Sequence, residues 1–411
     1  MTQDGLALGA ADSGASTPAL PWVSRGNAPC RVLELALDRL LHNRWPVRPT
    51  ALKPDDVRRI LVVRNDNIGD VLCSTPALRA LRRAFPGASR AILVAEPCRA
   101  VVERNPDLDL VFSYTKAKHR AGSGAGLAAR RDLRRVLLAL RRQRFDLAIS
   151  MRNSRSCAWL AYASGAPWRL GYPEPSWHPL RFLLNLGKER APVSMHQVDM
   201  GLELLGCLGI PPAGRQLTLA PDPAAQEAVR RKMRDAGAPP SARLACVHIS
   251  NRREASRWPL AAFAEIADRL RERLGFSILL SWSPGDESNP LFPGDDRGAD
   301  AVAAQMRAQP IRLRTSGLDD FIAAISVSHF LLSTDGGPMH MAAALNVPQV
   351  VIFGRTNPID WAPVSEKCAV LKCGERADRV SVEEVWAAVV AVLSREKPDG
   401  GAARSASTAA S

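Results

Sequence analysis

Short runs of β-branched residues and leucine alternate along the chain with longer stretches whose apolar positions recur at helical spacing. In the first half, the runs that predict strands lie at residues 60–63, 91–94, 110–112 and 147–149. In the second half, they lie at residues 244–249, 277–280, 330–332 and 349–353. Uninterrupted apolar runs of this length are typical of strands that are buried on both faces of a parallel sheet.

Helices are predicted between these runs, at residues 76–84, 129–142, 260–274 and 339–345. Because strand and helix alternate in both halves, the pattern predicts two doubly wound α/β domains. Residues 211–223 are rich in proline and small residues, which favours an interdomain linker. A ligand site is then expected in the cleft between the domains, since open parallel sheets bind ligands outside the carboxyl ends of their strands.

The two ends of the chain have a different composition. Residues 1–29 and 397–411 are rich in Gly, Ala, Ser and Pro and are expected to be disordered. The expected order is a mostly disordered extension at 1–54, a first domain at 55–215, a second domain at 216–396 and a disordered tail at 397–411.

Composition narrows the class of protein. Of the 411 residues, 46% are hydrophobic and 23% are charged, as in ordinary globular proteins. The 8 cysteines include no C-x-x-C pair, so we expect neither a disulfide framework nor a cysteine-rich zinc site, and a reducing cytoplasm is favoured. The N-terminus lacks the features of a signal peptide, and no stretch is apolar and long enough to span a membrane.

The net charge of +14 is unevenly distributed. Residues 51–220 contain 27 basic and 14 acidic residues, whereas residues 221–411 contain 23 of each. An excess confined to one half indicates a surface that meets an anionic partner. Nucleic acid is not expected to be that partner, because the chain has no long basic run and only 5% aromatic residues.

A polar loop follows the first predicted strand and ends in Gly69 and Asp70, before a helix. An ionised carboxylate at this position could accept a proton from a substrate hydroxyl, so Asp70 is a candidate general base. The alternative is that Asp70 only caps the helix. The loop lacks a G-x-G-x-x-G pattern, which argues against a dinucleotide site.

A glycine-rich turn follows the predicted strand at 330–332 and opens the helix at 339–345. Gly336 and Gly337 allow backbone N–H groups to face an anion at the positive end of the helix. Asp335 and His340 could bind sugar hydroxyls or phosphate. A purely structural turn is the alternative.

Two further strand ends in the second half carry polar side chains. The strand at 244–249 is followed by hydroxyl and cationic groups that could clamp a diphosphate: Ser250, Arg253, Ser256 and Arg257. The strand at 277–280 is followed by Glu287, which could bind a ribose or a base or could be a solvated carboxylate at a helix start.

Several strings of the sequence together resemble the ADP-heptose:lipopolysaccharide heptosyltransferases of glycosyltransferase family 9. They are RNDNIGDVLCSTPALRALRRAFPGA, HQVDMGLELLGCLGI, RWPLAAFAEIA and STDGGPMHMAAALNVPQVVIFGRTNP. Their order and spacing extend the resemblance over about residues 58–392.

The resemblance implies a GT-B fold, in which two Rossmann-like domains face each other across a cleft. It further implies an inverting transfer from ADP-heptose that needs neither a metal nor another cofactor. Asp70 falls on the family's catalytic base, and Asp335, Gly337 and His340 fall on its donor motif. The chain departs from the family at Gly336 and at Ser256, where members usually carry Thr and Lys; Arg253 or Arg257 is expected to supply the missing cation.

The implied acceptor is phosphorylated Kdo-lipid A or the lipopolysaccharide core, which fits the basic first domain. Arg64, Arg152 and Arg155 are the candidate acceptor-binding residues. Six arginines are expected on the solvent side of the helix at 129–142 and are assigned to the anionic inner face of the cytoplasmic membrane: Arg130, Arg131, Arg134, Arg135, Arg141 and Arg142. The alternative is that they only form a solvated helix face.

Other functions remain open at this point. A Rossmann oxidoreductase would need a dinucleotide glycine loop, which the sequence lacks. A non-catalytic protein that binds nucleotide sugars or lipopolysaccharide, or a family member that uses another nucleotide sugar, is compatible with the same motifs.

Overall fold

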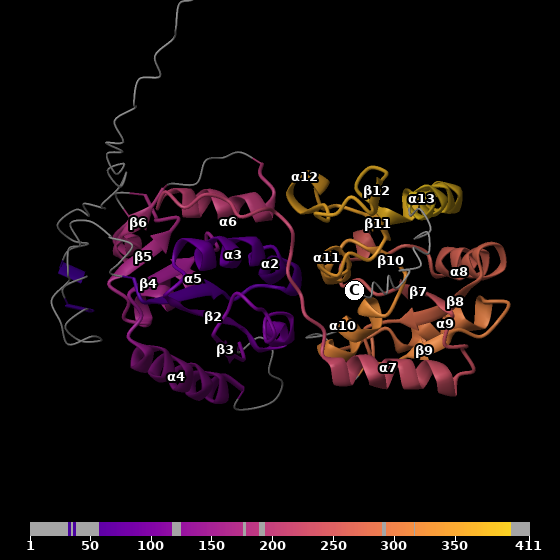
Figure 1. Ribbon diagram of the computed structural model, residues 1–411, viewed down its shortest axis with the longest axis horizontal. Helices are drawn as coiled ribbons and strands as arrows, with labels where there is room; N and C mark the ends of the chain where they lie inside the picture. The colour runs from indigo at the N-terminus through magenta and orange to yellow at the C-terminus, as the bar shows by residue number, and fades with distance from the viewer. Residues whose placement is uncertain are drawn as a thin grey trace, which may run out of the picture.

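Two six-stranded parallel sheets, one in each half of the chain, organise the molecule (Figure 1). This computed structural model describes residues 32–33, 36–37, 57–116, 125–175, 178–188, 194–289, 293–315 and 317–395. The tails expected to be disordered at 1–29 and 397–411, and nearly all of the extension at 1–54, lie outside the described residues.

The first sheet has the strand order β3-β2-β1-β4-β5-β6. Its strands are β1 (Arg59–Arg64), β2 (Ser89–Ala95), β3 (Leu110–Tyr114), β4 (Leu147–Ser150), β5 (Trp168–Gly171) and β6 (Leu186–Gly187). The order reverses between β1 and β4, which pair in parallel with Ile60 opposite Leu147.

The second sheet has the order β12-β11-β10-β7-β8-β9. Its strands are β7 (Arg243–His248), β8 (Phe276–Ser281), β9 (Ile311–Leu313), β10 (Phe330–Thr334), β11 (Gln349–Phe353) and β12 (Cys368–Lys372). Here the order reverses between β7 and β10. Each sheet therefore has one switch point, where open α/β sheets bind ligands. The predicted doubly wound architecture is confirmed.

Helices cover both faces of each sheet, which explains the uninterrupted apolar runs. Along β1, Ile60 and Val62 belong to a core with α3 (Thr75–Ala84) and α6 (Gln197–Gly206), whereas Leu61 and Val63 belong to a core with α4 (Ala125–Gln143) and α5 (Arg155–Ala163). In the second half, α8 (Leu260–Leu274), α9 (Asp296–Gln305) and α13 (Val382–Ser394) share one core. Two further helices, α7 (Pro223–Asp235) and α10 (Leu318–Ser326), pack against each other.

Residues 211–222 contain no helix or strand, in agreement with their composition, and run from α6 between the two lobes to α7 (Figure 1). The segment is attached to the first lobe, because the backbone N–H of Thr218 donates to Oγ1 of Thr75 (2.9 Å) and Arg79 donates to Oγ1 of Thr218 (2.6 Å). Within the described part of the chain, no helix has the length and apolar character to cross a bilayer.

Candidate functional site

Asp70 lies in the short helix α2 (Ile68–Leu72), which begins just after β1. The cap of α2 is Asn67, and Asp70 is the third residue of the helix. Its carboxylate accepts hydrogen bonds from the backbone N–H (3.4 Å) and the side-chain amide (3.2 Å) of Asn67 and from Arg64 (3.1 Å). Asp70 thus supports the cap, yet 16% of its side chain stays exposed.

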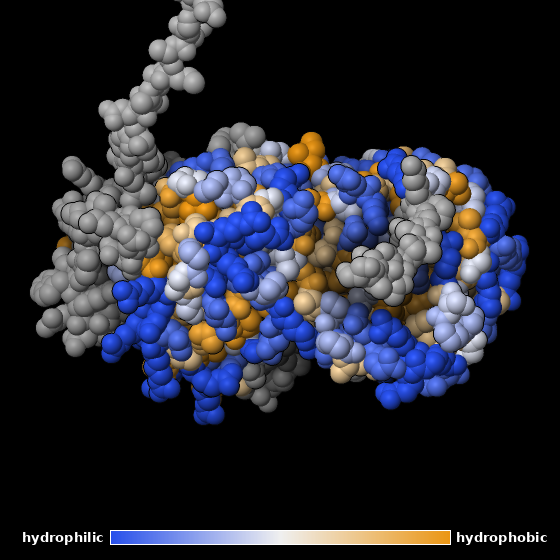
Figure 2. All heavy atoms as spheres, viewed as in Figure 1, coloured by the Kyte–Doolittle hydropathy of each residue, from blue (hydrophilic) through white to orange (hydrophobic). Residues whose placement is uncertain are grey.

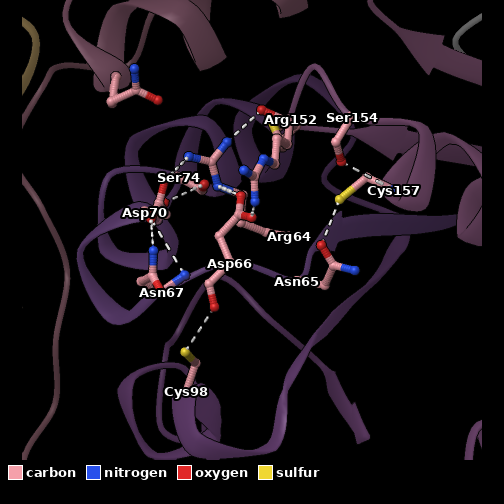
Figure 3. Close-up of polar contacts among 12 residues, drawn as sticks. Arg64, Asn65, Asp66, Asn67, Asp70, Ser74, Cys98, Arg152, Ser154 and Cys157 are labelled. Carbon is pink, nitrogen blue, oxygen red and sulfur yellow. Dashed lines mark hydrogen bonds and ion pairs between the residues drawn. The ribbon is translucent and has the colours of Figure 1, made fainter. Parts of the chain in front are cut away.

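Two arginines and a buried carboxylate connect the ends of β1 and β4 at the first switch point (Figure 3). The Asp66 side chain is fully buried, lies 3.3 Å from Nε of Arg64 and also pairs with Arg152. Arg64 is only 4% exposed and also donates to the backbone O of Met151. It therefore lies behind Asp70, whereas the guanidinium of Arg152 is half exposed on the loop after β4.

A second set of polar contacts fixes the loop between β1 and α2, which contains Asn65 and Asp66. The side chain of Asn65 donates to Oη of Tyr114 (2.9 Å) and accepts from Sγ of Cys157 (2.9 Å), while Sγ of Cys98 donates to the backbone O of Asp66 (3.4 Å). Burial raises the pKa of Tyr114, so its hydroxyl stays protonated. The backbone that carries Asp66 and Asp70 is consequently fixed on several sides.

The second switch point joins the ends of β7 and β10. Asn251 donates from its amide to Oγ1 of Thr334 (3.0 Å) and to the backbone O of Asp335 (2.7 Å). Gly336 then caps α11 (Gly337–Ala344). Burial raises the pKa of Asp335, and a hydrogen bond from Thr356 acts against this rise.

Cationic and hydroxyl side chains border Asp335. Arg253 donates to Oγ1 of Thr356 (2.9 Å) and lies 4.0 Å from Oδ2 of Asp335, with 67% of its side chain exposed. Arg257 is exposed and donates to the backbone O of Asn251 (2.9 Å). Together these groups form a polar rim above the carboxyl ends of β7, β10 and β11.

The segment that follows β8 is hydrogen-bonded to the segment that follows β7. Ser250 donates to Oδ2 of Asp295 (2.9 Å) and accepts from the backbone N–H of Ser283 (3.0 Å). Glu287 is exposed on the loop that follows β8. Burial raises the pKa of Asp295, which no motif in the sequence singled out.

Ser256 has a different environment from the other candidates. It is completely buried, and its hydroxyl has no hydrogen-bond partner among the described residues. The turn that contains it packs so closely on Gly354 that a Cβ there would lie 2.1 Å from the backbone O of Ala255. Ser256 therefore faces the protein interior.

The helices that follow the two switch points, α2 and α11, touch each other between the lobes (Figure 1). His340 of α11 is 2% exposed, and its Nδ1 lies 3.7 Å from Sγ of Cys73. Burial lowers the pKa of His340 to about 3, so the ring is neutral. Gly337 packs against Ile68.

The structure thus brings Asp70 close to the glycine-rich start of α11. Arg155 differs from its expected place in a loop: it is the first residue of α5 and pairs with Glu174 (2.7 Å). Asp66 and Asn251 were missed by the sequence analysis. The available signal was that each lies within three residues of a strand end, among residues that had already been selected.

Two other features of the described residues concern ligands. They contain no group of three or more His, Cys, Asp or Glu side chains that could hold a metal ion. A cavity of about 430 Å³ lies between the start of α6 and α12 (Pro358–Trp361), lined by residues such as Met195, His196 and Ile359. None of its lining residues is among the candidates from the sequence.

Comparisons with known proteins identify the family of the chain. Residues 133–386 match the family described as Glycosyltransferase family 9 (heptosyltransferase). Lipopolysaccharide heptosyltransferase 2 of Escherichia coli K12 is 26% identical over 324 residues, which cover 76% of this chain and 88% of that protein. Lipopolysaccharide heptosyltransferase 1 of Pseudomonas aeruginosa is 26% identical over 306 residues, which cover 73% and 79%.

Solved structures show the same fold. The glycosyl transferase family 9 protein of Veillonella parvula gives a TM-score of 0.70 at 22% identity, with 82% of this chain and 97% of that chain covered. The ADP-heptose heptosyltransferase II of Escherichia coli gives 0.64 at 21% identity, with 82% and 99% covered. The expected GT-B fold is therefore confirmed.

Proposed function

The chain belongs to glycosyltransferase family 9, and from this premise we propose that it transfers a heptose from ADP-heptose to a lipopolysaccharide acceptor, with inversion and without a metal. The names of its curated relatives, lipopolysaccharide heptosyltransferases, support the acceptor, and the name of the similar ADP-heptose heptosyltransferase II structure supports the donor. The observation that carries the proposal is the contact between α2 and α11, which brings a half-buried carboxylate close to the N-terminus of a glycine-capped helix.

The reaction is a single displacement. The acceptor oxygen attacks the anomeric carbon while Asp70 takes its proton, and the bond from that carbon to the diphosphate oxygen breaks. Arg64 bonds the carboxylate of Asp70 from behind and so fixes its direction. In this proposal Arg64 acts through Asp70 and does not touch the acceptor itself.

The second lobe holds the donor. Negative charge grows on the leaving ADP, and the free N–H groups at the start of α11 and the guanidiniums of Arg253 and Arg257 offset it. Asp335 accepts a hydrogen bond from a donor hydroxyl. Ser250 and Glu287 lie one and two strands further along the sheet, where the nucleoside end of the donor would extend.

The acceptor is held from the first lobe. The half-exposed guanidinium of Arg152 can bind a phosphate or a Kdo carboxylate while its other nitrogen pairs with Asp66. Arg155, with 64% of its side chain exposed, lies three residues further along the chain and assists. The acceptor is phosphorylated Kdo-lipid A or a later core intermediate.

Helix α4 brings the protein to the anionic inner face of the cytoplasmic membrane. Arg130, Arg131, Arg134, Arg135 and Arg142 are exposed on it, whereas Arg141 is half-buried and donates to the backbone O of Ala163. Leu127 and Leu138, 55% and 45% exposed, share this side of the helix at spacings of three and four residues. Figure 2 shows hydrophilic residues gathered over the region of α4.

Incubation with radiolabelled ADP-heptose and Kdo-lipid A tests this function. Labelled lipid should form in the presence of EDTA, and an absolute need for Mg²⁺ or Mn²⁺ would contradict the metal-independent mechanism. Binding of ADP-heptose without turnover on any acceptor would identify a nucleotide-sugar binding protein instead. Turnover of another nucleotide sugar in preference to ADP-heptose would overturn the donor assignment.

A further inference from the structure

The contact between α2 and α11 consists of two side chains that each fill the space above a glycine of the opposite helix. A Cβ on Gly69 would lie 2.7 Å from Cδ2 of His340, closer than real Cβ atoms approach other atoms. A Cβ on Gly337 would lie 3.2 Å from Cγ2 of Ile68. Ile68 of the first lobe therefore fills the space above Gly337, and His340 of the second lobe fills the space above Gly69.

Neither glycine is required by its backbone conformation, because neither has a positive φ angle. Gly206 of α6 provides a comparison, because it is a helical glycine of the first lobe without a close neighbour. A Cβ built on Gly206 would meet no atom within 4 Å, so packing does not require a glycine there. Gly69 and Gly337 are thus explained by the opposite helix.

The part of the contact around His340 and Cys73 is buried and uncharged. His340 is 2% exposed and Cys73 is 1% exposed, and their pKa values, lowered to about 3 and raised to about 12 by burial, keep both side chains neutral. Two neutral groups at 3.7 Å add contact without adding a charge that salt could screen. Asp70 is the residue after Gly69 in α2.

We propose that Ile68, Gly69, Gly337 and His340 form an interlobe seam that sets the distance between Asp70 and the N-terminus of α11. This inference rests on the proposed function, because it assigns these residues to positioning the base against the donor. It predicts that a larger residue at Gly69 lowers the rate of transfer without weakening the binding of ADP, which the second lobe holds alone.

The first experiment compares Gly69→Ala with Gly206→Ala. Displacement of the reacting groups by about 1 Å costs about 100-fold in rate, so Gly69→Ala should lower kcat by about that factor while the Kd for ADP and the circular dichroism spectrum stay as in the wild type. Gly206→Ala should change none of these. Equal kcat values for the two variants, with an active wild type, would overturn the seam. An inactive wild type would instead count against the proposed function.

The second experiment needs no substrate. In the variant Ile68→Cys with Gly337→Cys, the two Cβ atoms would lie 3.4 Å apart, close to the about 3.5–4.5 Å that a disulfide spans. Oxidised glutathione should link these residues within the folded protein, as a mass spectrum of the joined peptides would show, and each single variant should give no such link. Failure of the double variant to form the bond while folded would show that the lobes do not meet as proposed.

The same double variant tests positioning when activity is measured. The oxidised protein should bind ADP with the affinity of the reduced protein, because both forms carry the same two substitutions and differ only in the disulfide. Its kcat should differ from that of the reduced protein. Reduction with dithiothreitol should then restore the kcat of the reduced protein. A linked protein whose kcat is unchanged by reduction would contradict a role of the seam in the reaction.

Discussion

The carboxylate of Asp70 has a structural and a proposed chemical role, and one substitution separates them. Asp70→Asn keeps an oxygen that can accept from Asn67 but loses the ability to take a proton. We expect transfer to fall by about 100-fold to 10,000-fold, the usual contribution of a general base, while ADP affinity stays unchanged. Single-turnover kinetics and calorimetric titration with ADP measure the two effects.

Asp199 provides the matched control for that variant. It is also the third residue of a helix, α6, and its carboxylate pairs with Arg215 at 2.8 Å. Asp199→Asn should therefore show what the loss of such a pair costs in stability, with turnover near the wild-type value. If Asp70→Asn has wild-type turnover, Asp70 only caps the helix and is not the general base.

We expect the ionised carboxylate of Asp335 to lower the free energy of unfolding of the protein without donor, although it contributes to donor binding. Burial raises its pKa above the ordinary 3.8, so the folded protein holds this proton more tightly than the unfolded chain does. The ionised carboxylate therefore costs stability above its folded pKa, and this cost disappears as the pH falls toward 3.8. Asp335→Asn should raise Tm near neutral pH, with a gain that shrinks on acidification.

The same variant should bind the donor less tightly. A hydrogen bond to a charged group contributes about 1.5–3 kcal/mol, so the Kd for ADP-heptose should rise by about 10-fold to 100-fold. Thermal unfolding over a range of pH and titration with the donor give the two results. A lower Tm at neutral pH would mean that the contacts of Asp335 with Arg253 and Thr356 outweigh its burial.

Individual site residues were predictable where a motif combined a strand end with a charged or glycine residue, as at Asp70 and Asp335. Their surroundings were not predictable, because they depend on contacts between distant segments. Asp66 meets Arg152 of another strand end, and Asn251 bonds the backbone of β10. His340 in the donor motif and Ser256 after β7 were both selected from the sequence as polar donor-binding residues, yet both are buried.

Seven of the eight predicted strands lie in the sheet interiors and only β3 lies at an edge, which has a physical reason. All eight predicted runs are strands in the structure, whereas β5, β6, β9 and β12 were missed. Three of these four, β6, β9 and β12, lie at sheet edges. Edge strands need fewer apolar residues, so a two-residue strand such as β6 leaves no pattern in the sequence. The order of the strands likewise depends on long-range pairing.

Helix α4 gives a prediction about membrane binding. Each arginine near an anionic membrane contributes about 1 kcal/mol, which is about fivefold in partition. Arg130→Gln with Arg131→Gln should therefore lower binding to vesicles that contain anionic lipid by about 25-fold, and turnover of a soluble acceptor should not change. Sedimentation with vesicles at two salt concentrations measures the binding.

A matched pair on the second lobe controls for net charge. Arg230 and Arg231 are adjacent and exposed on α7, as Arg130 and Arg131 are on α4. Arg230→Gln with Arg231→Gln should leave vesicle binding nearly unchanged. Equal losses in the two double variants would mean that overall charge, not the α4 surface, attracts the membrane.

The two lobes share one buried apolar cluster, although each has its own sheet. It contains Leu72 and Leu81 of the first lobe together with Phe321, Leu331 and Met341 of the second. Ion pairs also join the two halves of the chain: Arg104 pairs with Asp319 (2.8 Å) and with Asp222 (3.2 Å). These ion pairs are partly exposed, and such pairs contribute only about 0–1 kcal/mol each. The apolar cluster should therefore dominate the coupling between the lobes.

This coupling predicts how a nucleotide changes the unfolding of the entire protein. ADP is proposed to contact only the second lobe, yet it should shift a single cooperative transition, because the first lobe cannot unfold without exposing the shared cluster. At 100 times its Kd, ADP should add about 2.7 kcal/mol to the free energy of unfolding. Scanning calorimetry should show one peak with and without ADP, and Arg104→Ala should lower its temperature only slightly. Two resolved peaks, of which ADP moves only one, would show that the lobes unfold independently and that the shared cluster does not couple them.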